Sequence, residues 1–173
     1  IGRVGLITEP PPAADEALRL REALDDRIRE VLGRALCIRA VDAGSCNGCE
    51  LEIHALENPL HNIEGLGLRF VASPRHADLL LVTGPVARNM EVALRRTYDA
   101  MPDPKLVVAV GDCGCSGGIF GESYASRGPV SNVIPVDVAV PGCPPSPVRI
   151  LSGILTAISA PAASHQDQAS ARP

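Results

Sequence analysis

Four of the six cysteines in this 173-residue chain stand in contexts that suit metal or redox chemistry. Cys46 and Cys49 form a C-x-x-C motif, whereas Cys113 and Cys143 stand in the glycine-containing segments Gly-Asp-Cys-Gly-Cys and Pro-Gly-Cys-Pro-Pro. Thiolates are preferred ligands of Zn²⁺ and of iron–sulfur clusters. Three interpretations are open: a cubane cluster held by the pair and the two single cysteines, a zinc ion held by Cys46/Cys49 with Cys113/Cys115, and a dithiol exchange site at the C-x-x-C.

The spacing of the cysteines favours the cluster. The zinc interpretation leaves Cys143 without a role, and the dithiol interpretation requires neither Cys113 nor Cys143. A cubane cluster is larger than a single ion and accepts ligands from three separate loops. The glycines around these motifs would let backbone N–H groups approach the sulfur atoms; they are Gly44, Gly48, Gly111, Gly114, Gly117, Gly118 and Gly142. Cys37 stands apart within an apolar run, so we expect it to be a small buried core residue.

The elements that would position these cysteines follow from hydrophobic periodicity. Strands are expected at residues 36–42, 68–72, 79–83, 106–110 and 136–140, and helices at 15–32, 50–57, 89–100 and 148–158. This alternation is typical of a doubly wound, flavodoxin-like α/β domain with a mainly parallel sheet. The cysteine motifs follow the first, fourth and fifth strands. Because parallel strands all point the same way, the motifs should meet at one edge of the sheet, where open α/β sheets bind ligands.

The chain divides into three expected regions. Residues 1–35 would form an N-terminal segment with an amphipathic helix, which has balanced charges and is expected to pack on its own domain. Residues 36–160 would form the cluster-binding α/β domain. Residues 161–173 would form a polar tail.

Composition excludes several classes of function. A net charge of −4 without a basic tract argues against nucleic acid as a partner. No apolar run approaches the roughly 18 residues that a membrane span requires. No leader peptide is visible, so we expect a reducing, cytoplasmic environment in which clustered cysteines indicate metal or redox chemistry.

Five motifs together resemble a known family. They are Ala43-Gly44-Ser45-Cys46-Asn47-Gly48-Cys49-Glu50, Ser73-Pro74-Arg75-His76-Ala77-Asp78, Thr83-Gly84-Pro85, Gly111-Asp112-Cys113 and Pro141-Gly142-Cys143-Pro144-Pro145. Over roughly residues 40–155 the chain resembles the 20 kDa subunit of NADH:quinone oxidoreductase (complex I) and the related small subunits of NiFe hydrogenases. The resemblance implies a flavodoxin-like domain with one 4Fe-4S cluster beside the active site of a larger partner. By motif, the cluster ligands would be Cys46, Cys49, Cys113 and Cys143.

The C-x-x-C motif places the chain on the hydrogenase side of this resemblance, because complex I subunits usually have two adjacent cysteines there. No further cysteine-rich domain and no export signal are visible, so the chain looks most similar to small subunits of membrane-bound, energy-converting hydrogenases and formate hydrogenlyases. The resemblance implies a non-autonomous oxidoreductase subunit without catalytic residues of its own. It would pass electrons between a large catalytic subunit and a ferredoxin-like iron–sulfur subunit, in a complex with membrane subunits on the cytoplasmic side of the cell membrane. The complex I alternative would deliver electrons to quinone.

Two positions depart from the family pattern. Cys115 stands where the family more often has another residue, which leaves open whether Cys113 or Cys115 binds iron. Ser146-Pro147-Val148 replaces the common Arg-Pro-Glu, and this change should affect a partner contact rather than the cluster.

Four other side chains are candidates for chemical roles. Glu50 follows a cluster ligand and would either carry protons or favour the start of the next helix as a first-turn acid, and we favour the second role. His54, His61 and His76 are candidate ligands or proton carriers, although an isolated histidine is more typical of a surface or packing position.

Overall fold

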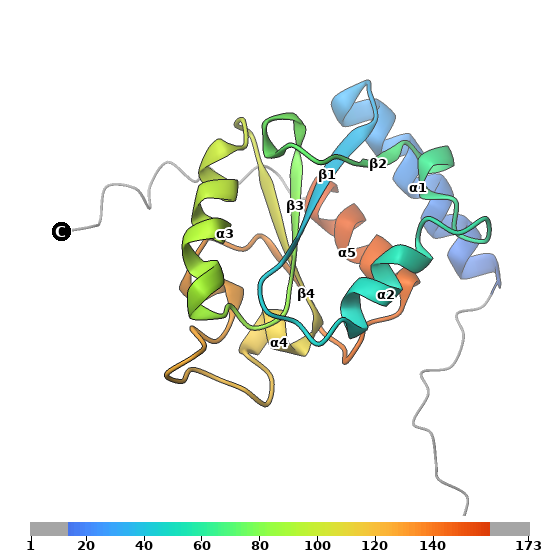
Figure 1. Cartoon of the computed structure of the whole chain (residues 1–173). Coiled ribbons are helices and arrows are strands. Elements are labelled where there is room, and N and C mark those ends of the chain that lie inside the picture. The colour runs from blue at the N-terminus through green and yellow to red at the C-terminus, as the bar shows by residue number, and fades with distance from the viewer. Residues whose placement is uncertain (1–13, 160–173) are drawn as a thin grey trace, which may run out of the picture.

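The computed structural model of the chain describes residues 14–159, and the expected polar tail at 161–173 lies outside this range. Five strands form one parallel sheet in the order β2-β1-β3-β4-β5 (Figure 1). Their bounds are β1 Leu36–Asp42, β2 Leu68–Phe70, β3 Leu79–Thr83, β4 Leu106–Val110 and β5 Val138–Val140. This is the strand order of flavodoxin-like doubly wound folds, so the predicted fold class is confirmed.

Helices cover both faces of the sheet. The α-helices are α1 Ala14–Leu32, α2 Gly48–Ala55, α3 Arg88–Ala100, α4 Gly111–Ser116 and α5 Pro147–Ser159, and short 3-10 helices lie at η1 Ile63–Leu66, η2 Pro74–His76 and η3 Val130–Asn132. One core cluster joins α1, α2 and α5 to the sheet, and a second joins α3 and the segment around η3 to the other face. The central strand β3 is therefore buried along its whole length.

The expected elements agree with the structure except at some ends. The strand predicted at 68–72 ends at Phe70, after which Val71 donates one more backbone hydrogen bond to Ile38 before the chain turns into η2. The strand predicted at 136–140 begins only at Val138. The Asp137 N–H donates to the Val107 carbonyl at 2.9 Å, and the Asp137 carboxylate accepts the Val107 N–H at 2.7 Å, so a side chain replaces one backbone acceptor at that step.

The segment after β4 contains a helix that is not among the expected elements. Residues Gly111–Ser116 form the short helix α4, which starts directly from the strand and ends at Gly117 with φ +86°. Figure 1 shows α4 where β4 ends, at the same edge of the sheet as the loop between β1 and α2.

Candidate metal centre

Four thiols from the three segments that follow β1, β4 and β5 line a single cavity at the carboxyl edge of the sheet. Cys46 and Cys49 follow β1, Cys113 follows β4 and Cys143 follows β5. The cavity has a volume of about 40 Å³, and its lining also includes the glycines 48, 84 and 142 with Ser45, Asp112 and Pro144. The fold thus brings together side chains that lie up to about 100 residues apart in the sequence, as the strand-end positions predict.

Hydrogen bonds to the carboxylates of two aspartates fix the segments that carry these thiols. Asp42 at the end of β1 accepts the backbone N–H groups of Gly44 and Ser45 at 2.8 and 2.7 Å. Asp112 accepts the N–H of Gly142 at 2.8 Å, and its own N–H donates to the Gly142 carbonyl at 2.9 Å. The second pair ties the Cys113 loop to the Cys143 loop. The motifs did not indicate a role for either aspartate, and the Gly-Asp-Cys motif was the only sequence signal near Asp112.

Two glycines bring the backbone directly against the sulfur atoms. A Cβ built on Gly111 would lie 2.5 Å from Cys49 Sγ, and one built on Gly118 would lie 2.8 Å from Cys113 Sγ. Both glycines have positive φ, +84° and +54°, which L side chains rarely adopt. The backbone therefore approaches two of the four thiols more closely than any other residue type would allow, as expected where backbone groups surround a bound cluster.

The thiols in the cavity disfavour one another's ionisation. Burial raises the pKa of Cys49 to about 12, with further contributions from the charges of Glu50, Cys46, Cys113 and Cys143. Burial also raises the pKa of Cys113, followed by the neighbouring Cys143 and Cys46. A cation entering the cavity would have to displace thiol protons and would neutralise this repulsion.

Helix α4 determines which of its two cysteines reaches the cavity. Residues two positions apart lie about 200° apart around a helix, whereas they would share a face in an extended chain. Cys113 lines the cavity, and Cys115 packs against the second core cluster with its Sγ 3.6 Å from the carbonyl oxygen of Ala109. Burial raises the pKa of Cys115 to about 11. Cys37 is buried in β1, as predicted.

Glu50 differs from an ordinary first-turn acid of a helix. It stands in the first turn of α2, but both of its carboxylate oxygens are buried without a hydrogen-bond partner among the residues that the structure describes. A solvated carboxylate at a helix start would face water instead. Glu50 thus occupies the predicted first-turn position, and its role there stays a prediction.

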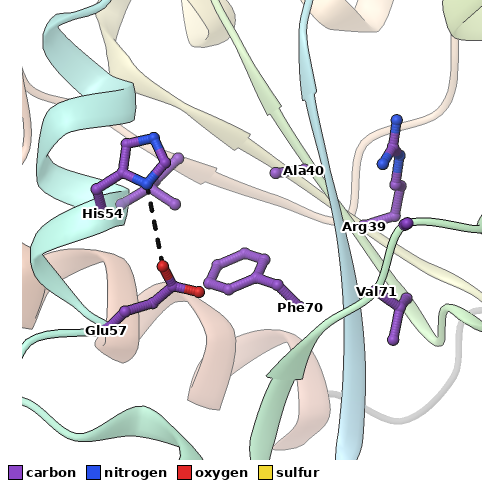
Figure 2. A pocket seen from close by; sticks show the side chains of 8 residues that line it. Arg39, Ala40, His54, Glu57, Phe70 and Val71 are labelled. Carbon is purple, nitrogen blue, oxygen red and sulfur yellow. Dashed lines mark ion pairs between the residues drawn. The ribbon is translucent and has the colours of Figure 1, made fainter.

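The three candidate histidines lie away from the thiol cavity. His54 and Glu57 stand 4.0 Å apart at a second pocket of about 300 Å³, where Phe70 lies beside them (Figure 2). His61 is partly buried, which lowers its pKa, and His76 is exposed in η2. Within residues 14–159, no three His, Cys, Asp or Glu side chains are arranged to hold a single metal ion.

Fold and site together define a class: a parallel α/β domain that gathers four cysteines at the ligand-binding edge of its sheet. Within this class, the chain belongs to the family described as the 20 kDa subunit of NADH ubiquinone oxidoreductase, whose model matches residues 46–157. This family consists of subunits of oxidoreductase complexes, and the resemblance found in the sequence motifs is confirmed.

Relatives come from both branches of the family. The chain is 45% identical over 141 residues to a probable membrane-bound hydrogenase subunit of Pyrococcus furiosus, covering 80% of this chain and 84% of the relative. It is 42% identical over 148 residues to formate hydrogenlyase subunit 7 of Escherichia coli, covering 86% and 57% of the two chains. It is 45% identical over 124 residues to an NADH-quinone oxidoreductase subunit of Desulfovibrio desulfuricans, covering 71% and 66%. The chain thus spans less than two thirds of the last two relatives.

A solved structure shows the same fold in a membrane complex. A chain of the membrane-bound sulfane sulfur reductase, an archaeal respiratory membrane complex, matches with a TM-score of 0.64 and 33% identity over 79% of this chain and 74% of that chain. In the part of the chain that the structure describes, no helix is both long enough and apolar enough to cross a membrane.

Proposed function

We propose that Cys46, Cys49, Cys113 and Cys143 hold one 4Fe-4S cluster, and that the chain is an electron-transfer subunit of a membrane-bound NiFe hydrogenase complex of the formate hydrogenlyase type. The observation that carries this proposal is the single cavity lined by all four thiols. The donor set fits, since four thiolates are the usual ligands of such a cluster. When bound, the cluster would accept and release one electron at a time.

The residues of this chain hold and orient the cluster rather than react with a substrate. The four thiolates would bind it, and Asp112 would keep two of their loops in register. The close backbone at Gly111 and Gly118 would shield the sulfur atoms from water. The catalytic step, in which H₂ is interconverted with protons and electrons, would belong to a large partner subunit that carries the NiFe centre.

The partners follow from the same proposal. Electrons would pass between the large catalytic subunit and a ferredoxin-like iron–sulfur subunit, and membrane subunits would anchor the assembly. Two of the relatives carry hydrogenase or formate hydrogenlyase names, and one relative and the solved structure are described as membrane-bound, which supports a peripheral position on such a complex. We place the chain on the cytoplasmic side of the membrane.

The experiment that tests the cluster is anaerobic purification of the chain followed by iron, sulfide and zinc analysis. We expect about four iron and four sulfide per chain and a broad absorption band near 400 nm, where the protein itself does not absorb. Cys143→Ser should abolish this band, because that thiol lies on the cavity, whereas Cys37→Ala should retain it. A colourless protein with one zinc ion, or with only a reactive Cys46–Cys49 dithiol, would contradict the cluster.

A second candidate function is a complex I-type subunit that passes electrons to quinone, and the relative from Desulfovibrio desulfuricans favours it. The large subunit that co-purifies with this chain distinguishes the two functions. A hydrogenase partner should contain paired cysteine motifs that bind nickel and iron. A partner without such cysteines would refute the hydrogenase assignment and support the quinone reductase.

A further inference from the structure

The thiol cavity contains one hydroxyl side chain, that of Ser45. Ser45 directly precedes Cys46 in the segment after β1 and lines the cavity together with the four thiols. Among the lining residues within 14–159, it has the only O–H group. The Asp112 carboxylate is a hydrogen-bond acceptor, and one of its oxygens already accepts the Gly142 N–H at 2.8 Å. Thiolates that bind a metal also only accept, so Ser45 is the side chain of the cavity wall that can donate.

The proton of the Ser45 hydroxyl is not used within the described part of the chain. Its Oγ accepts the backbone N–H of Asn47 at 3.1 Å, and no group among residues 14–159 accepts its proton. A serine hydroxyl can donate one hydrogen bond while it accepts two. The oxygen is thus held in place by the segment between the two cysteines of the C-x-x-C motif, and its O–H group can turn toward whatever fills the cavity.

The backbone of Ser45 is fixed from two sides. Its N–H donates to the Asp42 carboxylate at 2.7 Å. On the other side, a Cβ built on Gly84, just after β3, would lie 2.5 Å from the Ser45 nitrogen and 2.7 Å from its Cα. Gly84 has φ +76°, so the backbone of β3 reaches Ser45 at a position that only glycine fills without strain. A donor on such a fixed backbone does not have to reorganise when charge develops next to it.

We propose that the Ser45 hydroxyl donates a hydrogen bond to a sulfur atom that binds the iron, and that this bond raises the reduction potential of the cluster. The inference deepens the proposed function and rests on it. An added electron increases the negative charge on sulfur, so a hydrogen-bond donor stabilises the reduced form more than the oxidised form. Only one electron enters in this step, and the Ser45 proton remains on its oxygen.

A redox titration of the full chain, purified anaerobically with its cluster, tests this role. Ser45→Ala removes the donor, and its one-electron reduction equilibrium should fall about 3- to 10-fold, as expected when one hydrogen bond is lost. At about 59 mV per tenfold change, this lowers the potential by about 30–60 mV. Ser45→Thr keeps the hydroxyl and should retain most of the original potential.

Ser116 provides the matched control. It stands one helical turn after Cys113 but does not line the cavity, and its hydroxyl donates to the Asp112 carbonyl at 2.9 Å. Ser116→Ala should therefore leave the potential unchanged. Electron–nuclear double resonance of the reduced chains in D₂O gives a second measurement, because it detects exchangeable deuterons near the cluster. One deuteron coupling should disappear in Ser45→Ala and persist in Ser116→Ala.

Iron analysis of the same preparations separates failure of this role from failure of the cluster. A fully iron-loaded Ser45→Ala chain with an unchanged potential would overturn the role of Ser45 and leave the proposed function standing. Loss of iron in Ser45→Ala alone, or an equal shift of potential in Ser45→Thr or Ser116→Ala, would also overturn it, because the effect would then not come from the hydroxyl donor. An unmodified chain without iron would overturn the proposed function, and the role of Ser45 with it.

Discussion

Gly118 offers a direct test of whether the cavity geometry controls cluster binding, because the chain contains a matched control at Gly121. Both glycines have φ +54°, so alanine at either position incurs the same left-handed backbone strain, about 1–2 kcal/mol. The surroundings differ. A Cβ at position 118 would lie 2.8 Å from Cys113 Sγ and 3.2 Å from Cys113 Cα, whereas a Cβ at position 121 would meet nothing within 4 Å.

The steric part of the Gly118→Ala effect can be worked out from these distances. Ordinary non-bonded contacts of this kind lie at roughly 3.5–4.0 Å, so the sulfur would have to move by about 1 Å. Metal–ligand distances tolerate only about 0.2 Å. Cys113 cannot retreat as a whole, because its carbonyl is bonded to Gly117 and its backbone also lies close to the new methyl group. Relieving such an overlap costs about 1–3 kcal/mol, which corresponds to a roughly 5- to 150-fold loss of cluster affinity.

The assay compares both variants with the unmodified chain after anaerobic reconstitution. Before reconstitution, thermal or urea unfolding should show a loss of about 1–2 kcal/mol in Gly121→Ala from backbone strain, and a larger loss in Gly118→Ala, to which the overlap with Cys113 adds. Retention of iron against increasing chelator, followed at 400 nm, should fall only in Gly118→Ala. Equal iron retention in the two variants, whether both keep the cluster or both lose it, would refute the reasoning, because the contact with the Cys113 sulfur would then not control cluster binding.

Three further predictions test the ligand set, the loop at residues 117–128 and the sheet. Cys113→Ser should lose the cluster, whereas Cys115→Ser should keep its iron. Cys115→Ser should also lose about 1–3 kcal/mol of unfolding free energy, because it places a hydroxyl in the core. The reverse iron contents would show that Cys115 is the ligand. Hydrogen bonding to Arg127 lowers the pKa of Glu91 from its ordinary value of 4.5, so the pair contributes stability above that pH and loses it as the pH falls through the lowered pKa. Protection factors in residues 117–128, which correct for the slower intrinsic exchange at low pH, should accordingly fall in the unmodified chain below about pH 4.5 and should be low at every pH in Glu91→Gln. Protection that does not depend on pH in the unmodified chain would contradict this. Asp78→Ala should lower the free energy of unfolding in urea by about 1–3 kcal/mol, because the backbone N–H of Cys37 in β1, which donates to the Asp78 carboxylate at 3.0 Å, would lose its partner. An unchanged urea midpoint would contradict this role of Asp78.

Much of the fold could be predicted from the sequence because its signals are local. The strands at residues 36–42, 79–83 and 106–110 have the predicted bounds, since each is an apolar run between turn residues. The edges of the sheet were less predictable. There the backbone hydrogen bonds are supplemented by side-chain contacts, such as that of the Asp137 carboxylate with the Val107 N–H, between residues far apart in the sequence.

The site was predictable in position but not in detail. Parallel strands place residues after β1, β4 and β5 at one edge, so the meeting of the cysteine loops followed from topology. The choice between Cys113 and Cys115 depends on the six-residue helix α4, which is too short to show a helical period. The hydrogen bonds between Asp112 and Gly142 join residues 30 positions apart, and nothing in the local sequence indicates them.

The buried ionisable groups at the cavity do not account for the stability of the fold. Burial, followed by repulsion from neighbouring charges, raises the pKa of Cys49 to about 12, and both carboxylate oxygens of the adjacent Glu50 are buried without a hydrogen-bond partner among residues 14–159. Neither feature stabilises the folded chain, because burial disfavours the Cys49 thiolate and a buried polar group without a hydrogen-bond partner costs free energy. The stability must come from the two core clusters on the faces of the sheet, in which Cys46, Cys113 and Cys143 take no part. The scaffold thus positions the thiols at an energetic cost that a positively charged metal centre would offset, which is the arrangement expected where the ligands are placed before the cluster binds.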